Sequence, residues 1–270
     1  MITKERILSA LFALLMVTTL VKAELPKEQI CSLYNQANRD FSQANSTDDT
    51  EQAKKLYKKA ILGFERIINE GSIKNAKLYY NLANAYLLND QIGKAILNYR
   101  RAEKLDGSDE NIKKNLAFAR SKRTDKVVVK TEKRVLQTLF FWHYDFPIQT
   151  KFLLMCIFFG IVCLSSTAVL RFGRNSSFLA VIIICGIITL CLFTSVIIES
   201  ENQKSTINGV IIVNEIVARQ GDGQNYPESF KEPLHEGTEF ELLERRPQWF
   251  HIKLSDDSDA WIPVDSAELV

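Results

Sequence analysis

Three long stretches of the chain, each of fifteen residues or more, contain no charged residue, and they divide the sequence into parts of different character. They cover residues 7–21, 152–170 and 178–198. A helix rises about 1.5 Å per residue and a hydrocarbon core is about 30 Å thick, so the second and third stretches are each long enough to span a membrane. The residues between them are too few to fold independently. The pattern predicts a helical hairpin with transmembrane helices over 151–171 and 178–198 and a turn at 172–177.

The first uncharged stretch is shorter than a membrane span and follows a charged start. Lys4 and Arg6 precede it, and the small residues Val21 and Ala23 lie at its end. This order is typical of a secretory signal peptide, which we place over 1–23 with cleavage after Ala23. An uncleaved anchor is the alternative, and it would give the same topology.

The orientation of the hairpin follows from export of the N-terminal part. Arg171 and Arg174 flank the turn, which agrees with a cytoplasmic turn under the positive-inside tendency. Both soluble arms are then periplasmic. The stretch "LFFWHYDFP" at 139–147 is expected to be an aromatic belt at the outer interface.

Residues 28–123 are rich in helix formers and contain no proline. Breaks are expected at "NSTDD" (45–49) and "NEGS" (69–72), and from Ala76 apolar residues recur three and four apart on two successive helices. The motif Asn-x-Ala appears three times in comparable surroundings, within "YNQANRDF", "YYNLANAY" and "KNLAFAR". The spacing resembles the 34-residue tetratricopeptide repeat. We therefore assign a repeat domain to 24–123.

Each part of the repeat has an expected role. Ala37, Ala83 and Ala117 should let neighbouring helices approach closely, and Asn81 with its counterparts should form hydrogen bonds within the scaffold. The first copy is about twelve residues longer than the standard period, which predicts a long second helix over 50–70. Repeat proteins bind peptides on a concave face, and here the candidate binding residues are Tyr80, Asn84, Leu87, Lys114 and Phe118.

After the second span the pattern changes from helical to strand-like. Short apolar stretches at 209–213, 238–244, 249–254 and 260–264 alternate with turn-like segments. Phe250, Ile252 and Leu254 should face a core while their neighbours face outward. The sequence predicts a small all-β barrel over 204–270, and a juxtamembrane linker over 124–150 joins the repeats to the first span.

The predicted barrel resembles a bacterial SH3-like (SH3b) domain through "VARQG", "LHEGTEFELLE", Trp249 and "DAWIPV". Candidate ligand contacts are Trp249, Trp261 and Arg219. The two tryptophans could equally be buried anchors of a small barrel. The acidic run at 256–259 lacks the glycine and the bidentate glutamate of a calcium loop, so we predict a hairpin turn there.

Composition and charge limit the classes of function that the sequence supports. The formal net charge is +2, so no global electrostatic argument favours nucleic acid. Four of the five cysteines lie in the apolar spans, and no metal-binding or phosphate-binding motif is present, so we expect no cofactor and no enzymatic activity. A thiol hydrolase built on Cys31 is a remaining alternative. The basic stretch 121–134 could bind anionic lipid or wall polymer, or could be a solvated end of the repeats.

The complete order of signal peptide, repeats, membrane hairpin and SH3-like barrel is more specific than any single part. Together with "YNLANAY", "IKKNLAFAR", "FFWHYDFP" and "LHEGT", it resembles the Bat aerotolerance family, BatE type. This resemblance implies a non-enzymatic scaffold of the bacterial inner membrane that takes part in aerotolerance or envelope stress. Its implied partners are membrane-bound von Willebrand factor A proteins and a MoxR-type ATPase system. A peptidoglycan-binding or envelope-sensing membrane module is the alternative function.

Overall fold

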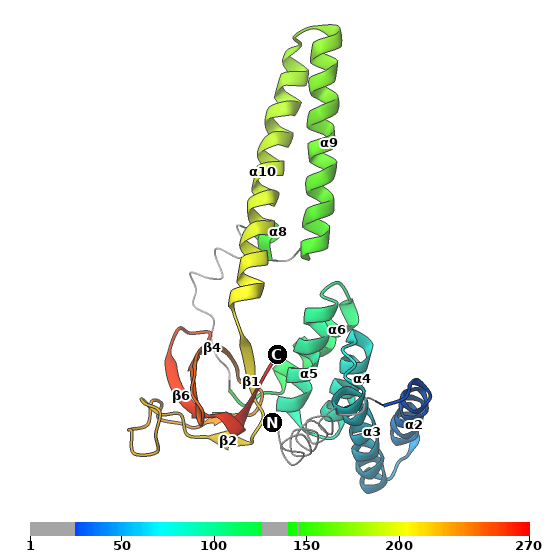
Figure 1. Cartoon of the computed structure of the whole chain (residues 1–270), viewed down its shortest axis with the longest axis vertical. Coiled ribbons are helices and arrows are strands. Elements are labelled where there is room, and N and C mark those ends of the chain that lie inside the picture. The colour runs from blue at the N-terminus through cyan, green and yellow to red at the C-terminus, as the bar shows by residue number, and fades with distance from the viewer. Residues whose placement is uncertain (1–24, 126–139, 145) are drawn as a thin grey trace, which may run out of the picture. The chain divides into compact units, whose positions relative to one another are not determined.

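The computed structural model describes residues 25–125, 140–144 and 146–270 (Figure 1). The predicted signal peptide and most of the predicted linker lie outside the described residues. The chain divides into two compact units, residues 1–90 and 91–270.

The described part of the first unit contains three helices, α2 (Lys27–Ser46), α3 (Thr50–Gly71) and α4 (Ala76–Leu88). The first break, 47–49, falls in the expected segment 45–49, and the second, 72–75, begins at the last residue of the expected segment 69–72. Asp49 caps α3, because its carboxylate accepts hydrogen bonds from the backbone N–H groups of Glu51 and Gln52. At the other end Ser72 takes a left-handed conformation with φ of 52°, which ends the helix. The long second helix predicted over 50–70 is confirmed.

Small residues allow α2 and α3 to pack closely. A Cβ atom added at Gly63 would lie 2.9 Å from the Cβ of Ala37, and the Ala37 side chain is buried. The Asn81 side chain of α4 donates hydrogen bonds to the Tyr34 hydroxyl and to the Asn38 side chain on α2, each at 3.3 Å. The predicted roles of Ala37 and Asn81 are therefore confirmed.

The second unit begins with another helix pair, α5 (Ile92–Leu105) and α6 (Glu110–Ser121). Ile112, Leu116 and Ala119 are the buried residues of α6, and they recur four and three apart on one face. Ala117 lies on another face and is exposed, so the expectation that it packs between helices is wrong. Ala119, two residues further on, is the fully buried alanine of this helix.

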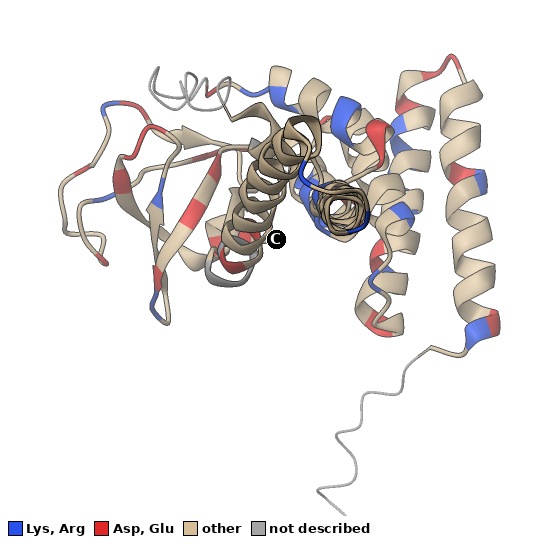
Figure 2. Cartoon of the chain, turned by 90° about the horizontal axis from the view of Figure 1, so that it is seen from above, with Lys and Arg blue, Asp and Glu red and all other residues tan. Residues whose placement is uncertain are grey.

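Two long apolar helices follow, α9 (Ile148–Phe172) and α10 (Ser176–Ser205). They pack against each other and are joined by a turn at 173–175. Both are long and apolar enough to cross a membrane, and their most apolar 18-residue stretches have mean hydropathies of 2.5 and 2.9. Figure 2 colours them tan over most of their length, in contrast to the charged helices and strands. A short helix, α8 (Phe141–Tyr144), precedes them within the predicted aromatic belt.

The C-terminal part of the second unit is antiparallel sheet. A five-stranded sheet has the order β6-β5-β4-β1-β7, and β2 pairs with β3 in a separate two-stranded sheet. Four of the strands coincide with the four predicted apolar stretches. The strands are β1 (Asn208–Ile211), β2 (Glu215–Ile216), β3 (Leu234–His235), β4 (Glu239–Arg245), β5 (Trp249–Lys253), β6 (Asp259–Pro263) and β7 (Ala267–Leu269), and a 3-10 turn, η2 (Val264–Ser266), precedes β7.

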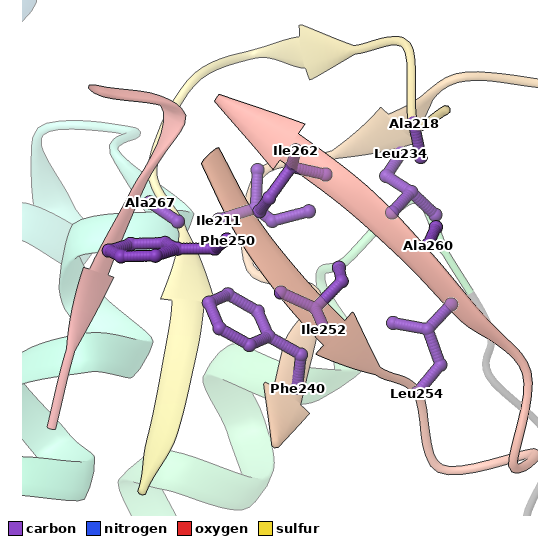
Figure 3. Close-up of a cluster of buried hydrophobic side chains, with 10 residues drawn as sticks. All are labelled: Ile211, Ala218, Leu234, Phe240, Phe250, Ile252, Leu254, Ala260, Ile262 and Ala267. Atoms are coloured by element: carbon purple, nitrogen blue, oxygen red, sulfur yellow. The ribbon is translucent and has the colours of Figure 1, made fainter. Parts of the chain in front are cut away.

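The core of the sheet lies on one face of the central strands (Figure 3). Phe250, Ile252 and Leu254 contribute to it from β5 and the residue after it, as their alternation predicts. The sheet does not close into the predicted barrel. Beyond β6 the pairing continues as a single bridge between Trp261 and Arg219, and β7 pairs with β1 alone among the described strands. The described fold is therefore a small open antiparallel sheet.

Candidate functional site

Helices α5 and α6 meet the sheet at a cluster of three arginines around one carboxylate. Glu239 is the first residue of β4, and its oxygens accept two hydrogen bonds of 2.7 Å from the Arg120 guanidinium. Arg123 lies 3.2 Å and Arg100 lies 3.3 Å from the same carboxylate. We call these four residues the Glu239 seam. A bidentate arginine–carboxylate pair is among the strongest side-chain contacts, so the seam holds both helices to the sheet.

Burial and charge act in opposite directions on Glu239. Its side chain is 22% exposed, and this burial on its own would raise the pKa of the carboxyl. The hydrogen bonds and charge of Arg120, with the charges of Arg100 and Arg123, outweigh burial and hold the pKa of Glu239 below its usual value. Glu239 is therefore ionised at neutral pH and forms ion pairs with the three arginines.

A second contact fixes the end of the α6 segment to the sheet. The Asp125 carboxylate accepts hydrogen bonds from the backbone N–H of His235 at 2.7 Å and from the Thr238 hydroxyl at 2.6 Å. The Nδ1 atom of His235 lies 2.7 Å from its other oxygen. Burial raises the pKa of Asp125, but these hydrogen bonds outweigh it and lower that pKa. Asp125 is thus a fixed anion between α6 and β3.

Two glycines allow the backbones of α5 and the sheet to approach each other. A Cβ atom at Gly93 would lie 2.6 Å from the carbonyl oxygen of Ile211, which is a backbone atom and cannot turn away. The Gly93 N–H donates a 2.9 Å hydrogen bond to the Glu236 carboxylate. Gly237 has a φ of +84°, and a Cβ there would lie 2.9 Å from the Ile96 side chain. Only glycine fits at both positions without displacing a neighbour.

The last strand is also bound to α5. Arg101 forms an ion pair of 3.0 Å with Glu268 and donates a 2.8 Å hydrogen bond to the Leu269 carbonyl. Lys104 donates to the carbonyl of Val270 at 3.1 Å. With the Glu239 seam, Asp125 and the two glycines, these contacts make the α5–α6 pair and the sheet one folded body.

The residues predicted to contact a ligand on the sheet are Trp249, Trp261 and Arg219. Trp261 is 8% exposed; its ring stacks on His251 with centroids 4.6 Å apart, and the Arg246 guanidinium lies 4.5 Å from its centre. Arg219 pairs with Trp261 through backbone hydrogen bonds of 2.9 and 2.8 Å. Trp249 is 9% exposed and pairs with Pro263 across the strands. The structure thus brings Arg219 and Trp261 together, and Arg246 occupies ring surface that a ligand would need.

The predicted groove residues fall in both compact units. Tyr80, Asn84 and Leu87 are half-buried on α4 in the first unit. Lys114 and Phe118 are exposed on α6 in the second unit, where Phe118 keeps 54% of its surface accessible.

A further polar cluster joins α8 to the two long helices. Lys151 is fully buried near the start of α9, and its ammonium group forms an ion pair with Glu199 of α10 and donates to the His143 carbonyl. The Nδ1 atom of His143 lies 2.6 Å from the Ser195 hydroxyl. Burial and then the charge of Lys151 lower the pKa of His143, so this imidazole is neutral at pH 7.

Neither ionic cluster was predicted from the sequence. The ion pair between Lys151 and Glu199 could have been predicted, because these two residues flank the uncharged stretches at the end opposite the turn. The Glu239 seam had no comparable signal, since Glu239 lies 116 residues along the chain from Arg123.

The acidic turn at 256–259 uses its carboxylates locally. Asp256 accepts hydrogen bonds from the backbone and the hydroxyl of Ser258, and Asp259 contacts His251. The predicted hairpin turn is confirmed. Among the described residues, no group of three or more histidine, cysteine or acidic side chains is placed to hold a metal ion.

Comparison with known proteins does not assign a family. No protein-family model matches the chain, and no curated protein matches it. The resemblance to the Bat family therefore stays a prediction.

Proposed function

We propose that this chain is a membrane-anchored adaptor that binds partner proteins through its helical arm and its sheet. The observation that carries this proposal is the single body formed by α5, α6 and the sheet. Its internal contacts use the Glu239 seam and Asp125, so the helices and the sheet present their outer surfaces in a fixed mutual orientation. Fixed orientation reduces the entropy lost when a partner contacts both surfaces.

The membrane hairpin supplies the second part of the proposal. Two apolar helices joined by a short turn could insert in a bilayer and leave both arms on the same side. A body bound near a membrane meets other membrane proteins at a high effective concentration. The adaptor would then collect its partners at the bilayer surface.

The resemblance to the Bat family suggests the identity of the partner proteins. Under it, the arms are periplasmic, the membrane is the bacterial inner membrane, and the bound proteins are von Willebrand factor A proteins working with a MoxR-type ATPase. On this proposal α2–α6 are tetratricopeptide-type repeats, and the open sheet is a member of the SH3-like class.

The test is crosslinking in intact cells, followed by purification of the tagged full-length chain in detergent and quantitative mass spectrometry. We expect membrane-bound partner proteins, including the von Willebrand type, to be enriched over the same cells expressing an untagged chain. Enrichment of peptidoglycan fragments without protein partners would overturn the adaptor proposal in favour of a wall-binding module. Recovery of neither, from a folded and membrane-inserted chain, would also overturn it.

A further inference from the structure

One face of α6 is left uncovered by the residues that the structure describes. Lys114, Ala117, Phe118, Ser121 and Lys122 are all exposed, and their spacing of three, four, seven and eight residues places them on one stripe of the helix. We call these five residues the α6 stripe. The opposite face carries the buried residues that contact the rest of the unit. The stripe is therefore the outer surface of the helix.

The first helix pair shows what covers the equivalent position. Ala37 and Ala117 are the alanines of two copies of the same Asn-x-Ala motif. On α2, Ala37 is 1% exposed because α3 crosses it at Gly63. On α6, Ala117 is exposed, and the next described element along the chain is the four-residue helix α8. The position that receives a helix in one pair is thus open in the other.

The chemistry of the stripe favours an acidic occupant. Phe118 offers an exposed ring, and the Lys122 ammonium lies 5.2 Å from its centre. The Lys114 side chain is exposed and forms no ion pair or hydrogen bond with another residue that the structure describes. Ala117 and Ser121 are small, so a backbone could approach on either side of the ring. An apolar centre between two cations matches an amphipathic helix whose apolar face is bordered by carboxylates.

The chain's own next segment has the wrong charge for this role. Residues 126–134 contain four basic side chains and one acidic side chain. Placing them beside Lys114 and Lys122 would bring like charges together, which costs free energy. Charge complementarity therefore favours an occupant from another protein.

We propose that the α6 stripe docks an acidic amphipathic helix of a partner protein, in the place that α3 takes on α2. This inference rests on the proposed adaptor function and names the chemistry of the partner segment. It can fail while the adaptor function holds, if the partners bind α4 or the sheet instead.

The first test places a photo-crosslinking amino acid, p-benzoylphenylalanine, at position 117 of the full-length chain in living cells. We expect crosslinks to one segment of another protein, and its sequence should show helical apolar periodicity with an excess of Asp and Glu. Crosslinks to residues 126–139 of the same chain, to a second copy, or to lipid would overturn the proposal. So would the absence of any crosslink in cells where the crosslinking and purification described above recover partners.

The second test uses two matched synthetic helical peptides with the same apolar face, one bordered by Glu and one by Lys. The purified full-length chain in detergent should bind the Glu peptide at least about tenfold more tightly at low salt, and added salt should reduce the difference. Equal affinities would contradict the assignment of an acidic partner.

Variants locate the binding on the stripe. The double change Lys114→Glu and Lys122→Glu should abolish the preference for the Glu peptide, and Phe118→Ala should weaken binding of that peptide at all salt concentrations. The matched control is Lys55→Glu with Lys59→Glu on α3, which makes the same change of charge at exposed helical positions. Hydrogen exchange of α5 and α6 checks that each variant is folded. An equal loss in the control pair would show non-specific charge attraction and overturn the proposal.

Discussion

The helix pairs α2–α3 and α5–α6 both contain the Asn-x-Ala motif, yet their packing differs. In α2–α3 the motif alanine is buried between the two helices at Gly63. In α5–α6 the corresponding Ala117 is exposed, and the pair is bound to a sheet through the Glu239 seam. The motif therefore does not determine what packs on its alanine, because the partner of each helix face depends on which segments fold against it.

The largest expected effect comes from removing the central carboxylate of the seam. In Glu239→Gln, three guanidinium groups would surround a neutral amide, and breaking one partner of a largely buried ion pair costs about 3 kcal/mol. Hydrogen exchange of the full-length chain in detergent should show faster exchange in β4 and α6. Exchange in α2 and α3 should not change.

The matched control for that change is Glu268→Gln. Glu268 pairs with Arg101, but its side chain is 45% exposed, so we expect the free energy of unfolding to fall by less than about 1 kcal/mol. Similar exchange rates in the two variants would mean that the seam contributes no more than a surface ion pair.

A second pair of variants compares the two motif alanines directly. Ala37→Leu adds volume where α2 and α3 are already in close contact, and overpacking of this kind costs about 1–3 kcal/mol. Ala117→Leu adds the same volume at an exposed position, where we expect a change within about 0.5 kcal/mol. The measurement is exchange protection of α2 in the first variant and of α6 in the second. A large loss of protection in α6 would show that Ala117 is covered in solution.

A smaller loss of stability is expected from adding a methyl group where α5 approaches β1. In Gly93→Ala the new methyl group would meet the Ile211 carbonyl, and the strain of about 1–3 kcal/mol is partly offset by about 1 kcal/mol from the better helix propensity of alanine. Thermal unfolding of the second unit should move to a lower temperature. The control is Gly107→Ala, whose Cβ would have only one neighbour, at 3.4 Å, and it should leave the unfolding temperature close to that of the unmodified chain.

Acid is the mildest way to weaken the seam. The pKa values of Glu239 and Asp125 are lowered in the folded chain, so both carboxylates contribute stability above their unfolded pKa values of about 4. This stability is lost as the pH falls through the lowered, folded pKa values. Exchange protection of β4, corrected for intrinsic exchange rates, should be constant between pH 7 and about pH 5 and should fall below about pH 4. A loss that begins above pH 6 would contradict this assignment.

Several elements were predictable because their signals are local. The two membrane helices follow from uninterrupted apolar stretches, and the ends of α2 and α3 follow from polar breaks. The inward side chains of β5 follow from alternation, because successive residues of a strand point to opposite faces.

The features that the sequence did not predict depend on contacts between distant residues. The prediction of a closed barrel was wrong, because closure depends on hydrogen bonds between the edge strands. The hydrophobic pattern of a strand indicates only which of its faces is buried. Trp261 was predicted as a candidate ligand contact from the sequence. Its stacking on His251 and its contact with Arg246 could not be predicted, because they depend on the register between β5 and β6.

The sequence by itself determined the order of a helical arm, a membrane-type hairpin and a sheet, because the hydrophobic period of each segment is set by its own backbone geometry. Tertiary structure alone decided that α5 and α6 fold with the sheet and that no described segment covers one face of α6. Those outcomes depend on Glu239 reaching arginines more than a hundred residues away in the chain, and on which helix face each packing partner covers. No periodic pattern within a single segment encodes such a pairing.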